Sequence, residues 1–215
     1  MALREKFLLF NNYGICMNHL AELAKLRNRY FIMRHGESLA NVHKIIVSEL
    51  QKGIAGFELT EKGKNQVLDS IKKNTVLDKH TIIYSSPFKR ARQTAELANE
   101  FLGTQPIHIT RKLRERFFGK WDLAPVSEYL KAWEHDCMNP GFEKDGVESV
   151  KSLLERTTSL IAELEKKYSS KKILIVSHGD PLQVLQTGFL NKNPSNHRRI
   201  EYLKCAEIRE LRLIK

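Results

Sequence analysis

The sequence predicts an α/β fold: a three-layer sandwich in which a mostly parallel central sheet is covered by helices on both faces. One observation is that short apolar runs alternate along the chain with segments whose apolar residues recur at helical spacing. Another is the run Ile173–Val176, which contains only β-branched residues and leucine and is typical of a strand buried on both faces. The third is a repeated string, because a histidine and then a glycine stand at the second and third positions after both Tyr30–Met33 and Ile173–Val176.

Residues 1–28 are interpreted as an N-terminal extension that is partly helical, and residues 29–215 as one domain. A chain of 215 residues is long enough to bury one core without disulfides. Within the extension, Asn18–Arg27 has apolar residues at helical spacing and therefore predicts a helix. The domain then begins with a strand, which we expect over Tyr30–Met33.

The first half of the domain alternates helices and strands. Thr60 predicts the N-cap of a helix, because apolar residues recur behind it at helical spacing. Thr81–Tyr84 predicts the next strand, and Pro87 suits the first turn of a helix that runs to about Phe101. Pro106–Ile109 predicts a further short strand.

The second half begins with Asp122–Gly146, the segment with the weakest pattern of the whole chain. A long helix is then expected over Val147–Tyr168, and the buried strand Ile173–Val176 follows it. The last segment, Ala206–Ile214, alternates polar and apolar residues and predicts an outer strand of the sheet.

Two histidines are expected to meet at one edge of the sheet. His35 and His178 follow predicted parallel strands, and ligands of such sheets bind beyond the carboxyl ends of the strands. Two imidazoles with Arg34 beside one of them suit an anionic, phosphate-like group better than a metal ion. The sequence offers no carboxylate or thiolate spacing for a metal site.

Composition indicates which partners are not expected and in which compartment the protein is expected. The net charge of +11 could steer an anion, but the chain lacks the aromatic–basic and zinc-finger patterns of nucleic-acid-binding proteins, so nucleic acid is not expected as a partner. No apolar run approaches the length of a membrane helix, so no membrane partner is expected either. Cys16, Cys137 and Cys205 are odd in number and far apart, which predicts free thiols and a cytoplasmic location.

A family resemblance rests on five segments in a fixed order. Arg34–Ser38 followed by Asn41 resembles the RHG[ET][ST]xxN signature of the histidine phosphatase superfamily, which has the phosphoglycerate-mutase-like fold. Four more segments are similar to further motifs of that family: Leu59–Gly63, Ser85–Ala95, Leu113–Gly119 and Ser177–Gly179. The resemblance spans residues 30 to about 190 and makes residues 29–215 a histidine phosphatase domain. It implies a metal-independent phosphomonoesterase that needs no cofactor.

The resemblance also assigns catalytic roles. His35 is implied as the nucleophile, neutral at the attacking nitrogen, which forms a phosphohistidine intermediate. Arg34 and Arg90 are implied to bind phosphoryl oxygens, opposite a protonated His178. Glu115 resembles the general acid of the family. Its basic neighbours would lower its pKa while a phosphate dianion would raise it, and the sequence leaves the outcome open.

Further phosphate-binding residues are implied around these groups. Ser38 and Asn41 lie at an expected helix start, where backbone N–H groups favour an anion. Gly179 belongs to the second histidine motif and is expected to contact the phosphate as well. Gly36 is expected to let the backbone approach the phosphate closely.

Two nearby charged residues are not expected to take part in the chemistry. Arg92 competes with Arg90 for the phosphate, but a helix places the two side chains about 200° apart, and the motif favours Arg90. Asp180 precedes Pro181 and is expected to cap the next helix rather than to act as an acid.

Two other functions remain open at this point. The first is phosphoryl transfer of the phosphoglycerate mutase type, although Phe117–Gly146 is short and acidic where such mutases carry an arginine-rich insertion. Water is therefore the expected acceptor. The second is a non-catalytic phosphate-binding module that holds a partner. The substrate is left as a phosphorylated small molecule or a phosphoprotein, and the resemblance makes a homodimer an option because dimers are common in the family.

Overall fold

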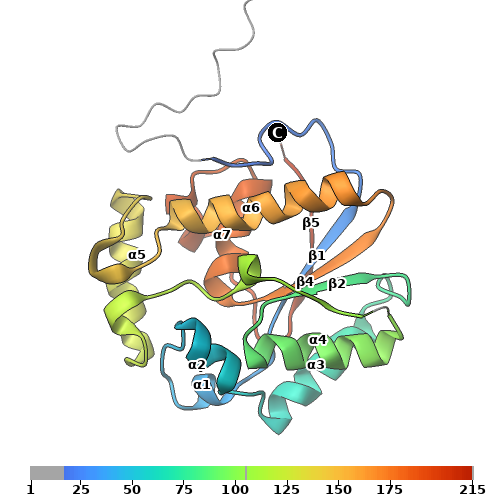
Figure 1. Ribbon diagram of the computed structural model, residues 1–215, viewed down its shortest axis with the longest axis horizontal. Coiled ribbons are helices and arrows are strands. Elements are labelled where there is room, and N and C mark those ends of the chain that lie inside the picture. Colours follow the sequence, from blue (N-terminus) through green and yellow to red (C-terminus); the bar gives the residue numbers. More distant parts are fainter. Residues whose placement is uncertain (1–16, 105, 215) are drawn as a thin grey trace, which may run out of the picture.

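The computed structural model describes residues 17–104 and 106–214 of the chain. Its centre is a five-stranded sheet with the strand order β3-β2-β4-β1-β5 (Figure 1). All neighbouring pairs are parallel except β1 and β5, so the predicted, mostly parallel sheet is confirmed. The strands are β1 Arg29–Arg34, β2 Ile82–Ser85, β3 His108–Ile109, β4 Lys172–Ser177 and β5 Ile208–Leu211.

Helices cover both faces of this sheet, as Figure 1 shows. Below it in that view lie α3 (Glu61–Lys73) and α4 (Lys89–Leu102). Above it lie α6 (Val150–Lys167) and α7 (Gly179–Phe189). The remaining helices lie to the left of the sheet in Figure 1; they are α1 Leu39–Val42, α2 Leu50–Ala55 and α5 Tyr129–Met138.

The two faces of the sheet belong to two separate hydrophobic clusters. In β1, Tyr30 and Ile32 join the cluster that contains apolar residues of α6 and α7. Phe31 and Met33 alternate with them and join the cluster that contains residues of α3 and α4. Because both faces are buried, the central strands are apolar at consecutive positions, which is why they could be recognised in the sequence.

The helix expected over Asn18–Arg27 is a wrong prediction. The segment forms turns instead, because tertiary contacts fix it against α6 and α7. The Asn18 side chain donates to the Gly188 carbonyl at 3.0 Å, and Leu20 is buried in the core. A helix of ten residues is marginal on its own, so such contacts decide its conformation. The part of the extension over residues 1–16 lies outside the described residues.

Two further expectations differ from the structure. The segment Asp122–Gly146 contains α5, which is held by a buried Ala132 and by contacts to other segments rather than by a strong sequence pattern. Helix α4 takes Phe88 as its N-cap, so Pro87 lies just before the helix and not in its first turn. No helix among residues 17–104 and 106–214 is long and apolar enough to cross a bilayer.

Candidate active site

His35 and His178 lie side by side at the carboxyl ends of two neighbouring parallel strands. The register of β1 and β4 pairs Arg34 with Ser177, so the residue after each strand reaches the same edge of the sheet. The two ring centroids are 5.2 Å apart, with an angle of 63° between the ring planes. Both histidines therefore lie at one edge of the sheet, where the sequence analysis placed them.

The hydrogen bonds of His35 define which ring nitrogen carries the lone pair. Nδ1–H donates to the carbonyl of Gly36 at 2.7 Å, and Arg90 Nε–H donates to Nε2 at 3.1 Å. Burial lowers the pKa of His35 well below its ordinary value, and the charges of Arg90 and Arg34 lower it further. The ring is therefore neutral at pH 7, with its lone pair on Nε2 and its orientation fixed by the backbone.

Gly36 is required for close packing between two backbone segments. A Cβ atom added to Gly36 would lie 2.4 Å from the carbonyl oxygen of Gly63, the third residue of α3. A Cβ added to Gly63 would lie 2.0 Å from the carbonyl oxygen of Glu37. The two glycines therefore let the first turn of α3 pack directly against the segment that follows His35, and this close packing fixes the position of the histidine.

The two arginines on either side of Ala91 in α4 have opposite environments. Arg90 is buried, and its Nη2 donates to the Val47 carbonyl at 3.1 Å. Arg92 is exposed and lies near Glu96, with 3.7 Å between Nη2 and Oε1. The structure thus brings Arg90 to His35 and keeps Arg92 on the outer face of the helix.

His178 is held from behind by Ser86. The Ser86 hydroxyl lies 2.8 Å from His178 Nε2 and accepts from the Phe88 N–H at 3.3 Å. Because the Ser86 oxygen already accepts from Phe88, we assign its hydroxyl proton to the bond with Nε2, which places the ring proton of His178 on Nδ1. Burial lowers the pKa of His178 well below its ordinary value, and Arg90 lowers it further. His178 is therefore neutral here rather than protonated, and an anion bound beside it would raise that pKa.

Three buried donors around His35 have no hydrogen-bond partner within the described residues. They are Arg34 Nε, Arg90 Nη1 and His178 Nδ1. Buried polar groups in folded proteins are almost always paired, so three such atoms on adjacent side chains indicate a binding site for a group rich in acceptors. A tetrahedral oxyanion has enough oxygens to accept from all three.

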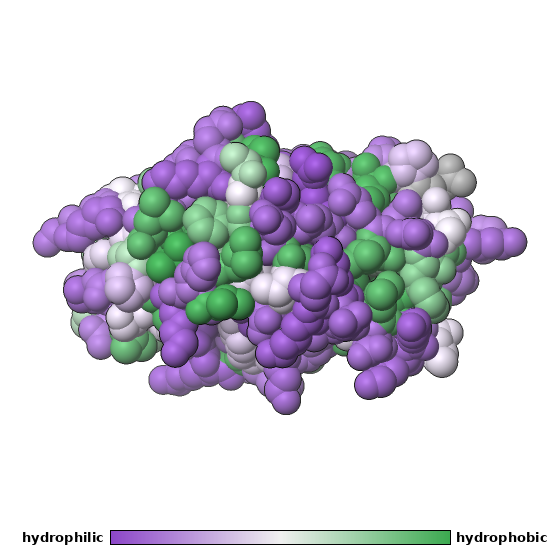
Figure 2. All heavy atoms as spheres, turned by 90° about the horizontal axis from the view of Figure 1, so that it is seen from below, coloured by the Kyte–Doolittle hydropathy of each residue, from purple (hydrophilic) through white to green (hydrophobic). Residues whose placement is uncertain are grey.

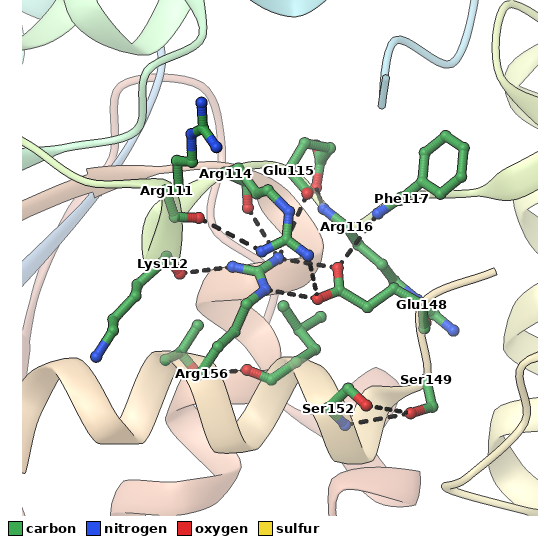
Figure 3. A network of polar contacts seen from close by, with 12 residues as sticks. Arg111, Lys112, Arg114, Glu115, Arg116, Phe117, Glu148, Ser149, Ser152 and Arg156 are labelled. Carbon is green, nitrogen blue, oxygen red and sulfur yellow. Dashed lines mark hydrogen bonds and ion pairs between the residues drawn. The ribbon is translucent and has the colours of Figure 1, made fainter. Parts of the chain in front are cut away.

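Glu115 supplies a buried carboxyl group next to these donors. Its Oε2 is 3.6 Å from Arg90 Nη2 and 3.7 Å from His178 Nδ1. Burial raises the pKa of Glu115 to about 7; Arg90 opposes this rise, and Asp180 adds to it. The sequence left open whether the pKa of Glu115 is lowered or raised, and burial decides that it is raised. The basic neighbours Arg111 and Lys112 direct their side chains away from the carboxyl group (Figure 3).

The turn that carries Glu115 is clamped by a partly exposed ion pair, Arg156–Glu148, that the sequence analysis missed (Figure 3). Arg156 of α6 donates from Nη1 to the Lys112 carbonyl at 2.5 Å and from Nη2 to the carbonyls of Arg114 and Glu115 at 3.0 and 3.3 Å. Its Nε donates to Glu148 Oε1 at 2.7 Å, and Arg114 donates to the same oxygen at 2.7 Å. The backbone next to the carboxyl group is therefore fixed from the core.

The remaining predicted site residues divide into two groups. Asn41 and Gly179 line the cavity at His35, whereas Ser38 does not. The N–H and hydroxyl of Ser38 both donate to Asn41 Oδ1 at 3.0 Å, so Ser38 orients Asn41. The predicted cap at Asp180 is wrong, because the N-cap of α7 is His178. Asp180 instead accepts from the Trp133 indole N–H at 3.0 Å, a contact with α5 that sequence spacing cannot show.

A cavity of about 490 Å³ reaches His35 and extends well beyond it. One end holds Arg34, His35, Arg90 and Glu115. The other end was missed by sequence reasoning, because its residues come from segments without a motif; they include Ile45, Val126, Tyr129, Trp133, Arg198 and Tyr202. Among residues 17–104 and 106–214, no group of three or more His, Cys, Asp or Glu side chains is placed to hold a metal ion.

Comparisons with known proteins agree on one family. A model described as the histidine phosphatase superfamily (branch 1) matches residues 30–214. The chain is 30% identical to the uncharacterized phosphatase PhoE of Bacillus subtilis over 165 residues, which are 76% of this chain and 78% of that protein. It is 27% identical to phosphoglycerate mutase-like protein 4 of Arabidopsis thaliana over 192 residues, or 85% of this chain and 78% of that one. The structure of a mycobacterial glucosyl-3-phosphoglycerate phosphatase superposes with a TM-score of 0.68 at 23% identity, covering 85% of this chain and 88% of that chain.

Proposed function

Because this chain belongs to the histidine phosphatase superfamily and is a phosphatase, we propose that it hydrolyses phosphate monoesters through a phosphohistidine on His35. The observation that carries this proposal is the convergence of three unpaired donors on His35, namely Arg34 Nε, Arg90 Nη1 and His178 Nδ1. They supply fixed hydrogen bonds where a phosphoryl group carries its charge. The lone pair on His35 Nε2 faces the same group of donors.

In the first step, His35 Nε2 attacks phosphorus and the bond between phosphorus and the ester oxygen breaks. The departing oxygen takes its proton from Glu115, whose pKa of about 7 leaves much of it protonated near neutral pH. Arg34, Arg90 and His178 hold the three non-bridging oxygens while charge spreads over them. The products of this step are the free alcohol and phospho-His35.

In the second step, water replaces the alcohol. Glu115 is now a carboxylate and takes a proton from the attacking water, while the bond between phosphorus and His35 Nε2 breaks and inorganic phosphate is released. A pKa near the working pH lets one side chain give a proton in the first step and take one in the second. The arginines and His178 supply the stabilisation that a metal ion supplies in other phosphatases.

Hydrolysis is favoured over phosphoryl transfer to a second substrate position. A mutase must hold a phosphorylated intermediate for re-transfer, which calls for additional cations near the phosphate. Beyond Arg34 and Arg90, the cations among the described residues that line the cavity are limited to Arg198, which lies 3.9 Å from Asp180. A purely binding role is disfavoured because a nucleophile, a general acid and oxyanion donors are all present in one cavity.

The domain and the compartment are also part of this proposal. We assign residues 29–215 to the catalytic domain, which is supported by a family match that begins at residue 30. A reducing compartment such as the cytoplasm is supported by Cys137 and Cys205, which are both free thiols. The substrate is a small phosphorylated molecule, in keeping with the size of the cavity.

Phosphate release from a panel of monoesters, including p-nitrophenyl phosphate, tests the proposal in the presence of a chelator. The wild type is expected to turn over, and His35→Ala to release no phosphate while still binding vanadate. His80→Ala removes an exposed histidine outside the cavity and is the matched control, with activity expected at the wild-type level. Equal turnover by His35→Ala and the wild type would overturn the proposal.

A further inference from the structure

The part of the cavity beyond the phosphate-binding groups has an aromatic wall. The rings of Tyr129 and Trp133, one turn apart on α5, are stacked with centroids 5.1 Å apart and an angle of 7° between their planes. Tyr202 and Ile45 add further apolar lining, and Val126 lies at the rim with 39% of its surface exposed. This wall lies next to Glu115 in the same cavity, so a leaving group protonated by Glu115 would contact it.

The surface around this end of the molecule is apolar as well. Figure 2 shows apolar side chains gathered left of centre, at the end where Figure 1 has α1 and α2. Val42 of α1 is 55% exposed, and the N–H of Val126 donates to the carbonyl of Lys44, two residues further along the chain.

The charged groups at this end of the cavity compensate one another. Arg198 lies over the Trp133 ring, with 3.7 Å between Cζ and the ring centroid, and 3.9 Å separates its Nη1 from Asp180 Oδ1. Its Nη1 also donates to the side chain of Gln183. A second phosphate or a carboxylate on the substrate would thus meet one cation that is already paired, and a carboxylate beside it. An uncharged organic group would neither compete for the paired Arg198 nor be repelled by the carboxylate of Asp180.

We infer that the substrates of this phosphatase are monophosphate esters of small, uncharged alcohols with an aromatic or other apolar group, which contacts the side chains of Tyr129 and Trp133. This inference rests on the proposed function, because the apolar group belongs to the alcohol that leaves in the first step of the proposed reaction. A cavity of about 490 Å³ suits a small molecule, and binding cavities of this size are usually apolar with a few polar groups that fix orientation. Phosphate binding then supplies affinity for any monoester, and the aromatic wall supplies the selectivity.

Three esters of primary alcohols test this inference, since their leaving oxygens are similarly basic and the intrinsic difficulty of hydrolysis is similar. They are benzyl phosphate, ethyl phosphate and 3-phosphoglycerate. We expect kcat/KM for benzyl phosphate to exceed that for each of the others by about tenfold or more, the effect of placing a few carbon atoms in an apolar pocket. Equal or higher kcat/KM for 3-phosphoglycerate would overturn the inference.

A pair of variants tests the location of the wall. Val126→Lys places a cation at the rim and is expected to raise the ratio of kcat/KM for 3-phosphoglycerate to that for benzyl phosphate by about tenfold. Leu130→Lys is the matched control, because Leu130 is 56% exposed on α5 and does not line the cavity; the ratio is expected to stay at the wild-type value. The same ratio in all three proteins would contradict the assigned location.

These experiments separate the two proposals. If the folded wild type hydrolyses none of the three esters and no p-nitrophenyl phosphate, the proposed function fails and the inference fails with it. If all three esters are hydrolysed at equal kcat/KM, the proposed function stands and the inference alone is overturned.

Discussion

Arg90 Nε–H donates to His35 Nε2 at 3.1 Å, so the nucleophilic nitrogen is covered by one of the guanidinium groups assigned to the phosphate. The other ring nitrogen is already bound to the Gly36 carbonyl. A phosphoryl oxygen is a stronger acceptor than a neutral imidazole, so a bound substrate would draw the Arg90 donor to itself. The lone pair would then be free at the moment when phosphorus lies in front of it.

Arg90→Lys is expected to lower kcat by about 10²–10³, the usual effect of removing one fixed donor from a developing oxyanion. Lysine keeps the charge but cannot reproduce the planar fork that contacts His35 and a phosphoryl oxygen together. Steady-state rates with p-nitrophenyl phosphate measure the loss. Arg92→Lys changes the exposed neighbour on α4 and is expected to retain wild-type rates. An equal loss in both variants would show that the effect comes from α4 as a whole.

Glu115→Gln is expected to discriminate between leaving groups. The value of kcat/KM reports the steps up to the transfer of phosphate to His35, where Glu115 gives its proton to the departing oxygen. An alkoxide needs that proton, whereas p-nitrophenolate leaves without it. We therefore expect kcat/KM for an alkyl phosphate to fall by about 10²–10⁴, and that for p-nitrophenyl phosphate to fall much less. Equal losses for both esters would remove Glu115 from the role of acid.

The pH dependence follows from the same carboxyl group and from His35. Glu115 must be protonated for the first step and has a pKa of about 7, so kcat/KM for an alkyl phosphate should fall as the pH rises through about 7. His35 must be neutral, and its pKa is lowered by burial, so the acid limb should lie well below the ordinary range of histidine. In Glu115→Gln, the fall in kcat/KM above neutral pH should be absent. A profile that rises through pH 7 in the wild type would contradict this assignment.

Arg156→Lys is expected to impair proton donation by Glu115 without changing any group that contacts the phosphate. Lysine cannot hold three carbonyl groups and Glu148 at once, so the turn that carries Glu115 should lose its fixed position. We expect kcat/KM for an alkyl phosphate to fall about tenfold or more, with p-nitrophenyl phosphate less affected. We also expect a loss of about 1–3 kcal/mol in the free energy of unfolding, measured with denaturant.

The matched control for that experiment is Arg111→Lys. Arg111 is an exposed arginine in the same turn, and it should tolerate the change in both assays. A loss of activity in Arg156→Lys that is the same for both esters would indicate general destabilisation of the site and would contradict the positioning role.

The sequence predicted the parts of the fold that depend on local patterns. The runs at Tyr30–Met33 and Ile173–Val176 became the central strands β1 and β4, because strands buried on both faces are apolar throughout. Thr60 caps α3 by accepting from the Gly63 N–H, as its position predicted. Arg90 rather than Arg92 faces His35, since the helical period alone separates the two side chains.

The sequence could not predict features that depend on tertiary contacts. The segment at Asn18 has a helical pattern but is held in turns by α6 and α7. Asp180 has the position of a cap, yet its carboxylate is used by Trp133 from a helix that was not expected. The pKa of Glu115 depends on the balance between burial, which raises it, and the charge of Arg90, which lowers it. The contact between Ser86 and His178 forms only when their strands are paired in the sheet.

Trapping of the phosphoenzyme tests the central claim most directly. Glu115→Gln mixed with p-nitrophenyl phosphate should release one equivalent of p-nitrophenol rapidly, because the leaving group needs no acid while the attack of water lacks its base. Protein digestion and mass spectrometry should then locate a phosphoryl group that is stable to base and labile to acid on the peptide that contains His35. His35→Ala should show neither the burst nor the label. A phosphoryl label on another residue, or steady turnover without any label in His35→Ala, would contradict the account.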